Sequence, residues 1–532
     1  MSDDNELPEG WAKTRVDAIV QLVNGFAFKP TQWKSEGLPI IRIQNLNNPD
    51  ASFNYCPENL PDKVRVRNGD LLFAWSGTPG TSFGAHIWRG DDAWLNQHIF
   101  KVLFHREHLD VRFLRLAINQ NLDSYIRQAH GGAGLAHITK GRFEESELYI
   151  APLNEQSRIV AKIEELFSDL DAGVAALKRA KANLKRYRAS VLKSAVEGKL
   201  TEQWRAKHPA KEPASALLAR ILLERRQKWE ADQLAKFAAA KKEPPKNWRD
   251  KYVEPTPPDT TGLPELPVGW CWASVEQLLV NSPQNGAYFP KSLYGSGIPI
   301  IRIDDYQQFW SRSANEVQRV QVPPRDIELY GLSEGDILVN RVNSMTHLGK
   351  VLLIEARHLQ SIFESNMMRL RCVEKQVVTY VRDYLTSHSG IVRLRADAKW
   401  AVNQASINQQ DVQRTPVPFP PLAEQQRIVS VVDETLSQID AAEVQIEHGL
   451  LRAARLRQSI LKRAFEGKLV PQDPKDESAS ALLERLRTSR THDEANGTAA
   501  TSKPNRAKIK ESSGEPRTRI RRRASTRNQQ EE

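Results

Sequence analysis

The chain has 532 residues, of which 40% are hydrophobic, with a formal net charge of +11 and a mean hydropathy of −0.54. This length predicts two or three domains, and no apolar run approaches the roughly 20 residues that span a membrane. The opening residues are acidic and polar, unlike a secretory signal, and the three cysteines form no CxxC pair. These features argue against a membrane protein or a disulfide-stabilised secreted protein, and they predict a cytoplasmic location.

Most of the positive charge lies near the end of the chain. Between residues 503 and 527, ten Lys or Arg are opposed by two Glu. The remainder is nearly balanced, so the composition does not by itself indicate nucleic-acid binding. Residues after about 488 contain almost no large apolar side chains and are predicted to be disordered. We interpret the basic tail as a solvated extension or a non-specific DNA contact.

Residues 1–151 have the composition of an α+β domain of ordinary size. Segments rich in β-branched and aromatic residues alternate with turn-like sequences, and amphipathic segments follow them. Strands are predicted at 39–44, 70–75, 83–88 and 97–104, helices at 111–119 and 122–129, and a closing strand at 143–151.

A long helix is predicted over residues 152–201. Its apolar positions recur at steps of three or four, which is typical of coiled-coil packing. The segment ends at Glu197-Gly198-Lys199, where the glycine can adopt the left-handed conformation of a helix cap. The apolar stripe consists of Ile159, Ile163, Leu166, Leu170, Val174, Leu177, Leu184, Tyr187 and Val191.

The segment 202–265 is interpreted as a linker. Residues 214–241 are rich in Ala, Leu, Lys, Arg and Glu and are predicted to be helical. The proline-rich residues 243–267 are predicted to be extended.

The same plan then returns. Leu7-Pro8-Glu9-Gly10-Trp11 recurs as Leu266-Pro267-Val268-Gly269-Trp270, and the strand that begins at Gly37 recurs at Gly297. Residues 152–171 align with 421–440 without gaps, and ten of these twenty positions are identical. The duplication predicts a second α+β domain at 266–420, a second long helix at 421–470 and a C-terminal segment at 471–532. Strands are expected at 298–304, 336–342, 348–355 and 367–373, and the second apolar stripe is Ile428, Val432, Ile439, Ile446, Leu456 and Ile460.

The repeats also differ in how closely they match. The α+β parts agree only in short islands, whereas the helical parts agree almost throughout. A divergent module joined to a preserved one suggests a variable surface on a fixed scaffold. A long helix with one apolar seam is not stable alone, and its copy is the obvious partner.

The sequence contains no clear catalytic motif. Walker A, GxGxxG, HExxH and Gly-x-Ser-x-Gly patterns are absent, as is the Asn/Asp-Pro-Pro-Tyr/Phe motif of amino-methyltransferases. Glu197-Gly-Lys199 and Glu466-Gly-Lys468 resemble half of a nuclease metal site, but the end of a helix explains them better. Gly69-Asp70 and Gly335-Asp336 are interpreted as turns rather than as catalytic carboxylates. We predict no catalytic, metal or cofactor residues in this chain.

The order of the motifs resembles the specificity subunits of type I restriction–modification systems. A Leu-Pro-x-Gly-Trp opening is followed by Gly-x-Pro-Ile-Ile-Arg-Ile and Gly-Asp strands. Pro-Leu-x-Glu-Gln-x-Arg-Ile-Val then begins the long helix, and Leu-Lys-x-Ala-x-Glu-Gly-Lys-Leu ends it, all of it twice. The resemblance covers residues 1–486.

The resemblance implies a fold and a function. Two α/β target-recognition domains lie in tandem, each followed by a long helix, and the helices pair as an antiparallel coiled coil. Each domain reads one half of an interrupted double-stranded DNA site. The chain is non-catalytic, two methyltransferase subunits dock on the helices, and motor–nuclease subunits join them. S-adenosylmethionine, ATP and magnesium are expected in those partner subunits. The alternatives are a stand-alone DNA-binding protein and a metal-dependent nuclease.

Two polar loops in each copy are candidates for contact with DNA, because Asn and Gln can pair with adenine and Arg with guanine. The alternative is that they are ordinary solvated loops, and that Arg42 and Arg302 form ion pairs inside their domains. The candidates in the first domain are Arg42, Trp75, Ser76, Thr78, Thr81, Ser82, His137, Thr139 and Lys140. Those in the second are Arg302, Asn340, Arg341, Asn343, Ser344, Asn403, Gln404, Ser406 and Asn408.

Overall fold

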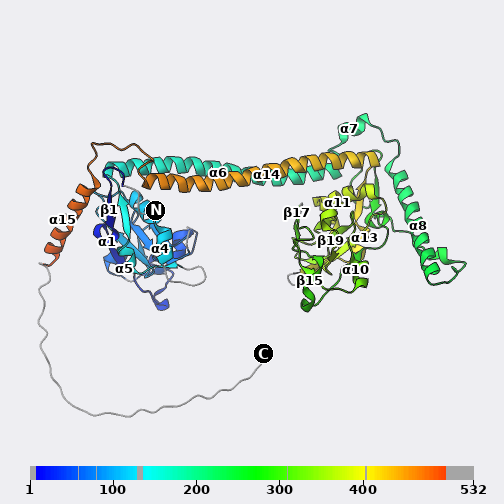
Figure 1. The fold of residues 1–532 in the computed structure, drawn as a ribbon, viewed down its shortest axis with the longest axis horizontal. Helices are drawn as coiled ribbons and strands as arrows, with labels where there is room; N and C mark the ends of the chain where they lie inside the picture. The colour runs from blue at the N-terminus through cyan, green and yellow to red at the C-terminus, as the bar shows by residue number, and fades with distance from the viewer. Residues whose placement is uncertain are drawn as a thin grey trace, which may run out of the picture. The chain divides into compact units, whose positions relative to one another are not determined.

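The structure is a computed structural model that divides the chain into two compact units. The first unit contains residues 1–170 and 455–532, and the second contains residues 171–454. Each unit therefore combines one α+β domain with parts of both long helices (Figure 1). The described residues are 7–498 except 49, 58, 79–80, 129–135, 308–309, 345 and 402–403, so the basic tail lies outside them.

The first α+β domain is built on a four-stranded antiparallel sheet in the order β2-β10-β6-β8. The central strand β6 is buried at every position, because α-helices cover one face of the sheet and a second sheet covers the other. On the helical side the rings of Phe73 and Phe143 stack with centroids 3.8 Å apart. The bounds are β2 (Gln21–Asn24), β6 (Leu71–Ala74), β8 (Gly84–Ile87), β10 (Ile99–Leu103) and the covering helix α3 (Val111–Gln120).

A smaller sheet, in the order β4-β3-β9-β5, completes this domain. Its central pair β3 and β9 is parallel, with Ile40 opposite Trp94. The chain ends of the domain meet where β1 pairs with β12, so the closing strand returns to the opening one. The bounds are β1 (Ala12–Arg15), β3 (Leu38–Ile41), β4 (Asn54–Cys56), β5 (Arg65–Val66), β9 (Ala93–Leu95) and β12 (Glu147–Ile150).

The second domain repeats this topology. Its main sheet has the order β14-β23-β19-β21, β15 and β22 form the parallel pair, and β13 pairs with β26 as the opening and closing strands. The helix α11 covers the sheet as α3 does in the first domain. The bounds are β13 (Cys271–Ser274), β14 (Gln284–Asn285), β15 (Tyr294–Ile301), β19 (Ile337–Asn340), β21 (Val351–Leu353), β22 (Ile362–Phe363), β23 (Met367–Leu370), α11 (Val378–Thr386) and β26 (Pro416–Phe419).

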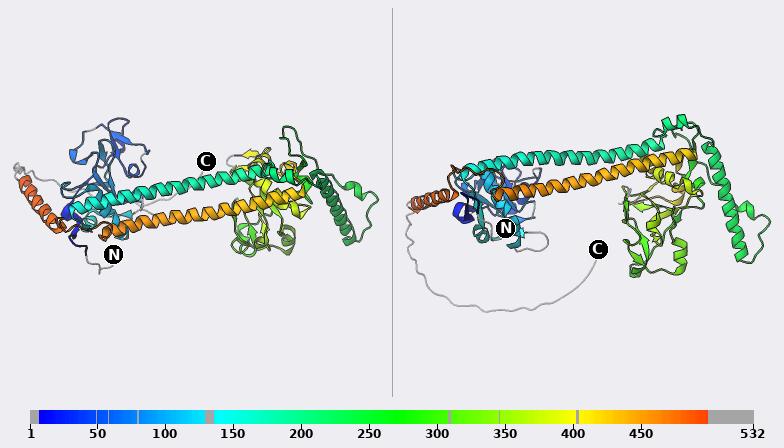
Figure 2. Two further views of the ribbon diagram at one scale, coloured as in Figure 1. Left: turned by 90° about the horizontal axis from the view of Figure 1, so that it is seen from above. Right: turned by 45° about the horizontal axis from the view of Figure 1, so that its top comes forward.

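The two long helices are α6 (Leu153–Val196) and α14 (Leu422–Phe465), each of 44 residues. They lie side by side in both figures (Figure 2). In the first unit, Arg457 of α14 lies over the ring of Phe167 of α6, 4.2 Å from its centroid. In the second unit, Lys181 pairs with Glu447 and Arg188 with Asp440. Residue numbers rise along one helix as they fall along the other, which confirms the antiparallel pairing.

Each domain is fixed to the start of the long helix that follows it. In the first unit, Trp11 donates its indole N–H to Glu155 Oε1 at 3.0 Å, and Glu155 is 1% exposed. In the second unit, Trp270 donates to Glu424 Oε2 at 2.8 Å, and Glu424 is 2% exposed. The Trp of each opening motif therefore meets the Glu of each Pro-Leu-x-Glu-Gln motif, in the first turn of a helix where negative charge is favoured.

Each opening motif also meets the end of the long helix from the other repeat. A Cβ atom at Gly467 would lie 2.5 Å from the Pro8 ring, and one at Gly198 would lie 2.5 Å from the Pro267 ring. Both glycines adopt the left-handed conformation, as the cap prediction requires. The helices that come after the long helices also contact the opening motif of the other repeat. Ala479 N–H donates to the Gly10 carbonyl, and Ala214 N–H donates to the Gly269 carbonyl. The two repeats thus exchange their C-terminal segments.

The linker prediction is confirmed for its helical part. Helix α8 (Ala214–Ala239) is followed by residues without regular structure, apart from the short 3-10 helix η3 (Trp248–Lys251). Trp229 of α8 stacks on Trp248 with ring centroids 5.9 Å apart, so this part of the linker folds back on the helix. At the other end of the chain α15 (Ala479–Thr498) extends ten residues beyond the predicted onset of disorder.

Several predicted details are wrong. The predicted strand at 39–44 ends at Ile41, and residues 143–144 belong to a short helix rather than to the closing strand. The predicted stripe includes Tyr187 and Leu456, but these side chains are 54% and 42% exposed. A pair of helices buries one narrow seam, so apolar positions beside the seam stay in solvent.

The Trp–Glu hydrogen bonds predict an unequal effect of two matched substitutions. Among the described residues, Trp11 is the only side-chain donor to Glu155, and Trp11→Phe removes it. After Trp270→Phe, Glu424 still accepts hydrogen bonds from Thr201 Oγ1 at 2.7 Å and Arg205 Nη1 at 2.6 Å. We expect Trp11→Phe to lower the free energy of unfolding by about 1–3 kcal/mol, and Trp270→Phe to lower it less. Trp400→Phe, at a side chain 71% exposed, is the control for thermal unfolding followed by circular dichroism. A Trp11→Phe variant as stable as this control would contradict the role of the bond.

Candidate nucleic-acid interface

In the first domain the two candidate loops form one surface. Strand β7 (Ser76–Gly77) directly follows β6 and pairs with β11 (Ala136–His137), which places Ser76 opposite His137. The backbone N–H of Ile138 also donates to the Trp75 carbonyl at 3.0 Å. Two segments about 60 residues apart in sequence are thereby joined at the end of the central strand.

Trp75 is the centre of this surface. Its ring centroid lies 4.6 Å from that of His137 and 5.9 Å from that of Phe100, and its indole N–H donates to the Gln97 carbonyl at 3.2 Å. A pocket of about 250 Å³ opens beside it. Four predicted DNA-contact residues line this pocket, namely Trp75, His137, Thr139 and Lys140.

The rest of the first loop is held by its own hydrogen bonds. Thr78 N–H donates to Ser82 Oγ at 3.0 Å, and Thr81 Oγ1 donates to the Thr78 carbonyl at 3.1 Å. Ser82 is 2% exposed, so its side chain shapes the loop and is not available to a ligand. Residues 79–80 at the tip lie outside the described residues.

The second domain joins its two loops in the same way. Strand β20 (Val342–Asn343) pairs with β25 (Gln404–Ser406), with Asn343 opposite Ala405. Ile407 N–H donates to the Arg341 carbonyl at 2.9 Å, which reproduces the bond between Ile138 and Trp75. A third strand, β24 (Lys399–Ala401), extends the sheet on the far side of β25. Asn403 lies outside the described residues.

Several candidates in the second domain have structural partners. Asn340 is fully buried and donates to the His347 carbonyl at 3.1 Å, which argues against its direct contact with DNA. Asn408 caps α13 (Gln409–Arg414) by accepting from the Gln410 and Asp411 N–H groups. Ser344 belongs to a network with Thr346 and His347, with distances of 2.9–3.0 Å. Contact of these residues with DNA stays a prediction.

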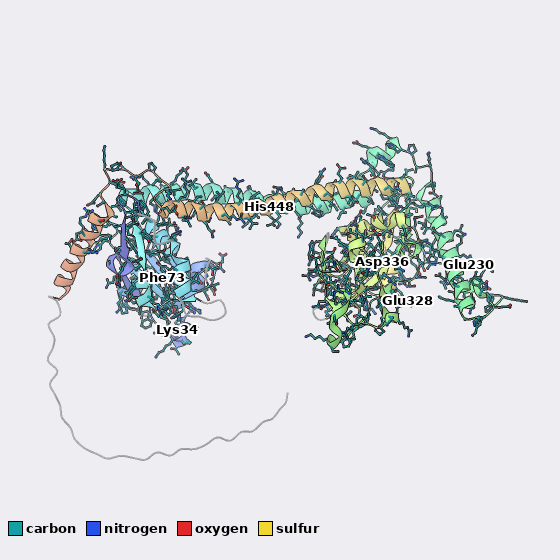
Figure 3. The ribbon with its side chains drawn as sticks, in the orientation of Figure 1. Lys34, Phe73, Glu230, Glu328, Asp336 and His448 are labelled. Carbon is teal, nitrogen blue, oxygen red and sulfur yellow. The ribbon has the colours of Figure 1, made fainter. Side chains whose placement is uncertain are left out.

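The most exposed side chains of this surface are not Asn340, Asn408 or Ser344. Gln404 is exposed, and Asn343 and Ser406 are partly exposed. Arg341 donates Nη1 to the Ser365 carbonyl at 3.2 Å, while its buried Nε is without a hydrogen-bond partner among the described residues. Asp336, labelled in Figure 3, lies inside the domain at 1% exposure, and its ion pair with Arg371 holds the turn that leads into β19.

Arg42 and Arg302 directly follow the last residues of β3 and β15. Arg302 Nε lies 3.5 Å from Glu364 Oε2, and its Nη1 donates to Gln318 at 3.1 Å. This supports the alternative of an ion pair inside the domain. Arg42 lies over the ring of Trp33, 5.3 Å from its centroid.

The structure adds Trp400 to the surface, which sequence reasoning missed. Trp400 is on β24 beside the candidate loop, and its ring is 71% exposed. An exposed tryptophan of this kind can stack on a base or pack on a thymine methyl group. In the sequence Trp400 is part of a Lys-Trp pair that has no match in the first repeat. No motif therefore indicated a role for this residue.

The Glu-Gly-Lys triplets lie where the cap interpretation places them. Lys199 Nζ donates to Glu197 Oε2 at 2.8 Å, and Lys468 Nζ donates to Glu466 Oε2 at 3.2 Å. Both triplets follow the last residue of a long helix. Their charged groups therefore neutralise each other at the helix end.

Each of the two domains thus carries two polar loops that are paired at the end of a central strand, and each is bonded to the start of a long helix. The family model described as "Type I restriction modification DNA specificity domain" matches residues 8–180 and 279–453. The chain belongs to this family and is a specificity subunit of the type I restriction–modification class.

The similarity to individual relatives extends over nearly the whole chain. The chain is 25% identical over 508 residues to the type I restriction enzyme EcoKI specificity subunit of Escherichia coli (strain K12), which covers 91% of this chain and 96% of that protein. It is also 25% identical to the StySPI specificity subunit of Salmonella potsdam, with the same shares covered. A solved structure also matches this chain, with a TM-score of 0.59 and 19% identity. Its description concerns complex assembly and conformational transition of the type I R-M system, and the match covers 87% of this chain and 100% of that one.

The capping role of Asn408 gives a stability prediction for this surface. Asn408→Ala removes the acceptor for two N–H groups at the start of α13, and we expect it to lower the free energy of unfolding by about 1 kcal/mol. Gln404→Ala, at an exposed neighbour, should change it by less than about 0.5 kcal/mol. Thermal unfolding of the two variants measures the difference. Equal effects would mean that Asn408 is not a structural cap.

Proposed function

We propose that each recognition domain reads one half of an interrupted DNA site through its paired loops. The observation that carries this proposal is the convergence of the two loops in both domains, on β7–β11 and on β20–β25. Sequence-specific contact requires polar side chains on a surface held by a rigid scaffold. The buried central strands β6 and β19 provide that scaffold, because each leads directly into the surface.

The two surfaces offer different chemistry. The first combines Trp75, His137 and Lys140, whereas the second offers the amides of Asn343 and Gln404 beside Trp400. Amide side chains suit adenine, and a cationic group beside aromatic rings suits phosphate and stacked bases. Two unlike surfaces on one chain would read two unrelated half-sites, which a symmetric dimer cannot do.

We further propose that the paired helices dock two methyltransferase subunits, and that motor–nuclease subunits join this complex. Large apolar side chains on the helices remain in solvent, including Tyr187, Val444 and Leu451 at 54%, 50% and 57% exposure. Apolar side chains exposed on long helices are typical of surfaces that pack against partner helices.

Under this proposal the chain itself is non-catalytic and acts in the cytoplasm. S-adenosylmethionine, ATP and magnesium would be bound by the partner subunits. Among the described residues no helix is both long and apolar enough to cross a membrane. The nuclease alternative relied on the Glu-Gly-Lys triplets, which are explained as helix ends. A stand-alone DNA-binding protein would bind its site tightly without partners, whereas a subunit would not.

The proposal predicts that the two half-sites can be altered separately. Asn343→Ala with Gln404→Ala should relax recognition of one half-site by roughly 1–3 kcal/mol per lost base contact, that is about 5- to 150-fold. Lys140→Ala with His137→Ala should affect only the other half-site. The measurement is methylation by the assembled complex on a library of DNA sites. A change in both half-sites from either pair of substitutions would contradict the two-surface assignment.

A further inference from the structure

The first domain contains a second, larger pocket that shares no residue with the candidate DNA interface. It has a volume of about 790 Å³, which lies in the range of small-molecule sites. It opens between β8, the smaller sheet and α3. Three aromatic side chains line one part, namely Phe53, Tyr55 and Trp88. The rings of Phe53 and Trp88 meet edge to face with centroids 6.3 Å apart.

The cationic side chains of this pocket are poorly neutralised. Arg115 of α3 and Arg89 after β8 both line it, and among the described residues no carboxylate lies within ion-pair distance of either guanidinium. Among the described residues, no atom forms a hydrogen bond with the buried Nε atom of Arg115. Burial lowers the pKa of Arg115, and the nearby charge of Arg89 lowers it further. Two arginines that repel each other beside an open pocket indicate a site for an anion.

The acidic residues near the pocket do not cancel this charge. Asp91 and Asp92 also line the pocket, but Asp92 is already paired with Arg65 at 2.6 Å, and Asp91 is exposed to solvent. Glu164 acts on Arg115 from a distance but pairs with Arg112 at 3.1 Å. His86 also lines the pocket, and its pKa is lowered mainly by burial, so it adds a neutral hydrogen-bonding ring.

The second domain provides an internal comparison. Arg382 is the fifth residue of α11, as Arg115 is of α3, but Arg382 pairs with Asp383 at 2.7 Å and lies 3.7 Å from Asp433. Glu355 stands two residues after β21, where Arg89 stands two residues after β8. The corresponding pocket measures only about 80 Å³. The same position of the fold is therefore filled and neutralised in one domain, and open and cationic in the other.

We propose that the pocket of the first domain binds a nucleotide, with its phosphate on Arg115 and Arg89 and its base against Phe53, Tyr55 and Trp88. Guanidinium groups bind phosphate through paired charge-assisted hydrogen bonds, and aromatic rings stack on any base. The nucleotide can be a free mononucleotide or the 5′-phosphorylated end of a nucleic acid, since both present the same group. This site is independent of the reading loops proposed above.

The test is isothermal titration of the full chain with adenosine 5′-monophosphate. We expect one saturable site, with a Kd at least tenfold below those for adenosine and for inorganic phosphate. Arg89→Glu, which introduces the residue of the second domain at a surface position, should raise this Kd at least tenfold. Lys63→Glu makes the same change of charge at an exposed position of the same domain outside the pocket, and should change the Kd less than twofold.

Two further results decide the outcome. A 5′-phosphorylated oligonucleotide is titrated against the bound mononucleotide. If the oligonucleotide binds more tightly than the mononucleotide, the site is assigned to nucleic acid. If the oligonucleotide binds more weakly, the site is assigned to a free nucleotide. No saturable binding, binding of inorganic phosphate as tight as that of the mononucleotide, or equal weakening by Arg89→Glu and Lys63→Glu would overturn the proposal. DNA-site recognition by the complex is measured separately, so its failure does not affect this test.

Discussion

In each unit a buried glutamate in the first turn of a long helix accepts the indole N–H of the tryptophan that opens the domain. A buried carboxylate is costly without partners, and burial raises the pKa of Glu155. The Trp–Glu bond therefore ties each domain to its helix at one defined point. The positions of β1 and β13, and of the sheets behind them, follow from this joint. Packing adds to this joint, since Ile159 and Ile163 of α6 belong to the core of the first domain.

The exchange of C-terminal segments between the repeats gives each opening motif a second set of contacts. Gly467 and Ala479 contact the opening motif of the first domain, and Gly198 and Ala214 contact that of the second. Each domain is consequently held by residues from both repeats. This explains why the Leu-Pro-x-Gly-Trp and Glu-Gly-Lys motifs are preserved in both copies, while the loops between them diverge. The preserved residues build the joints, and the divergent ones build the paired loops and the pocket of the first domain.

Much of this architecture could be predicted from sequence, because the duplication and the apolar spacing report directly on the backbone. The long helices, their partnership and the strands β6 and β19 were found in this way. The convergence of the two loops on paired strands was not, since pairing between β7 and β11 depends on contacts that no local pattern encodes. Asn340 illustrates the limit for single residues. Its amide suits adenine, but the strand places it inside the domain, where it holds the loop.

The central claim is that each domain reads its own half-site on a common scaffold, and a domain replacement tests it most directly. Residues 271–419 would be replaced by residues 12–150, which joins equivalent strand pairs, β1–β12 in place of β13–β26. The opening motif, the helix joints and both long helices stay unchanged. Methylation mapping of the assembled complex should then show a site with two inverted copies of the first half-site. An unchanged recognition sequence, or one unrelated to the first half-site in both halves, would contradict the account.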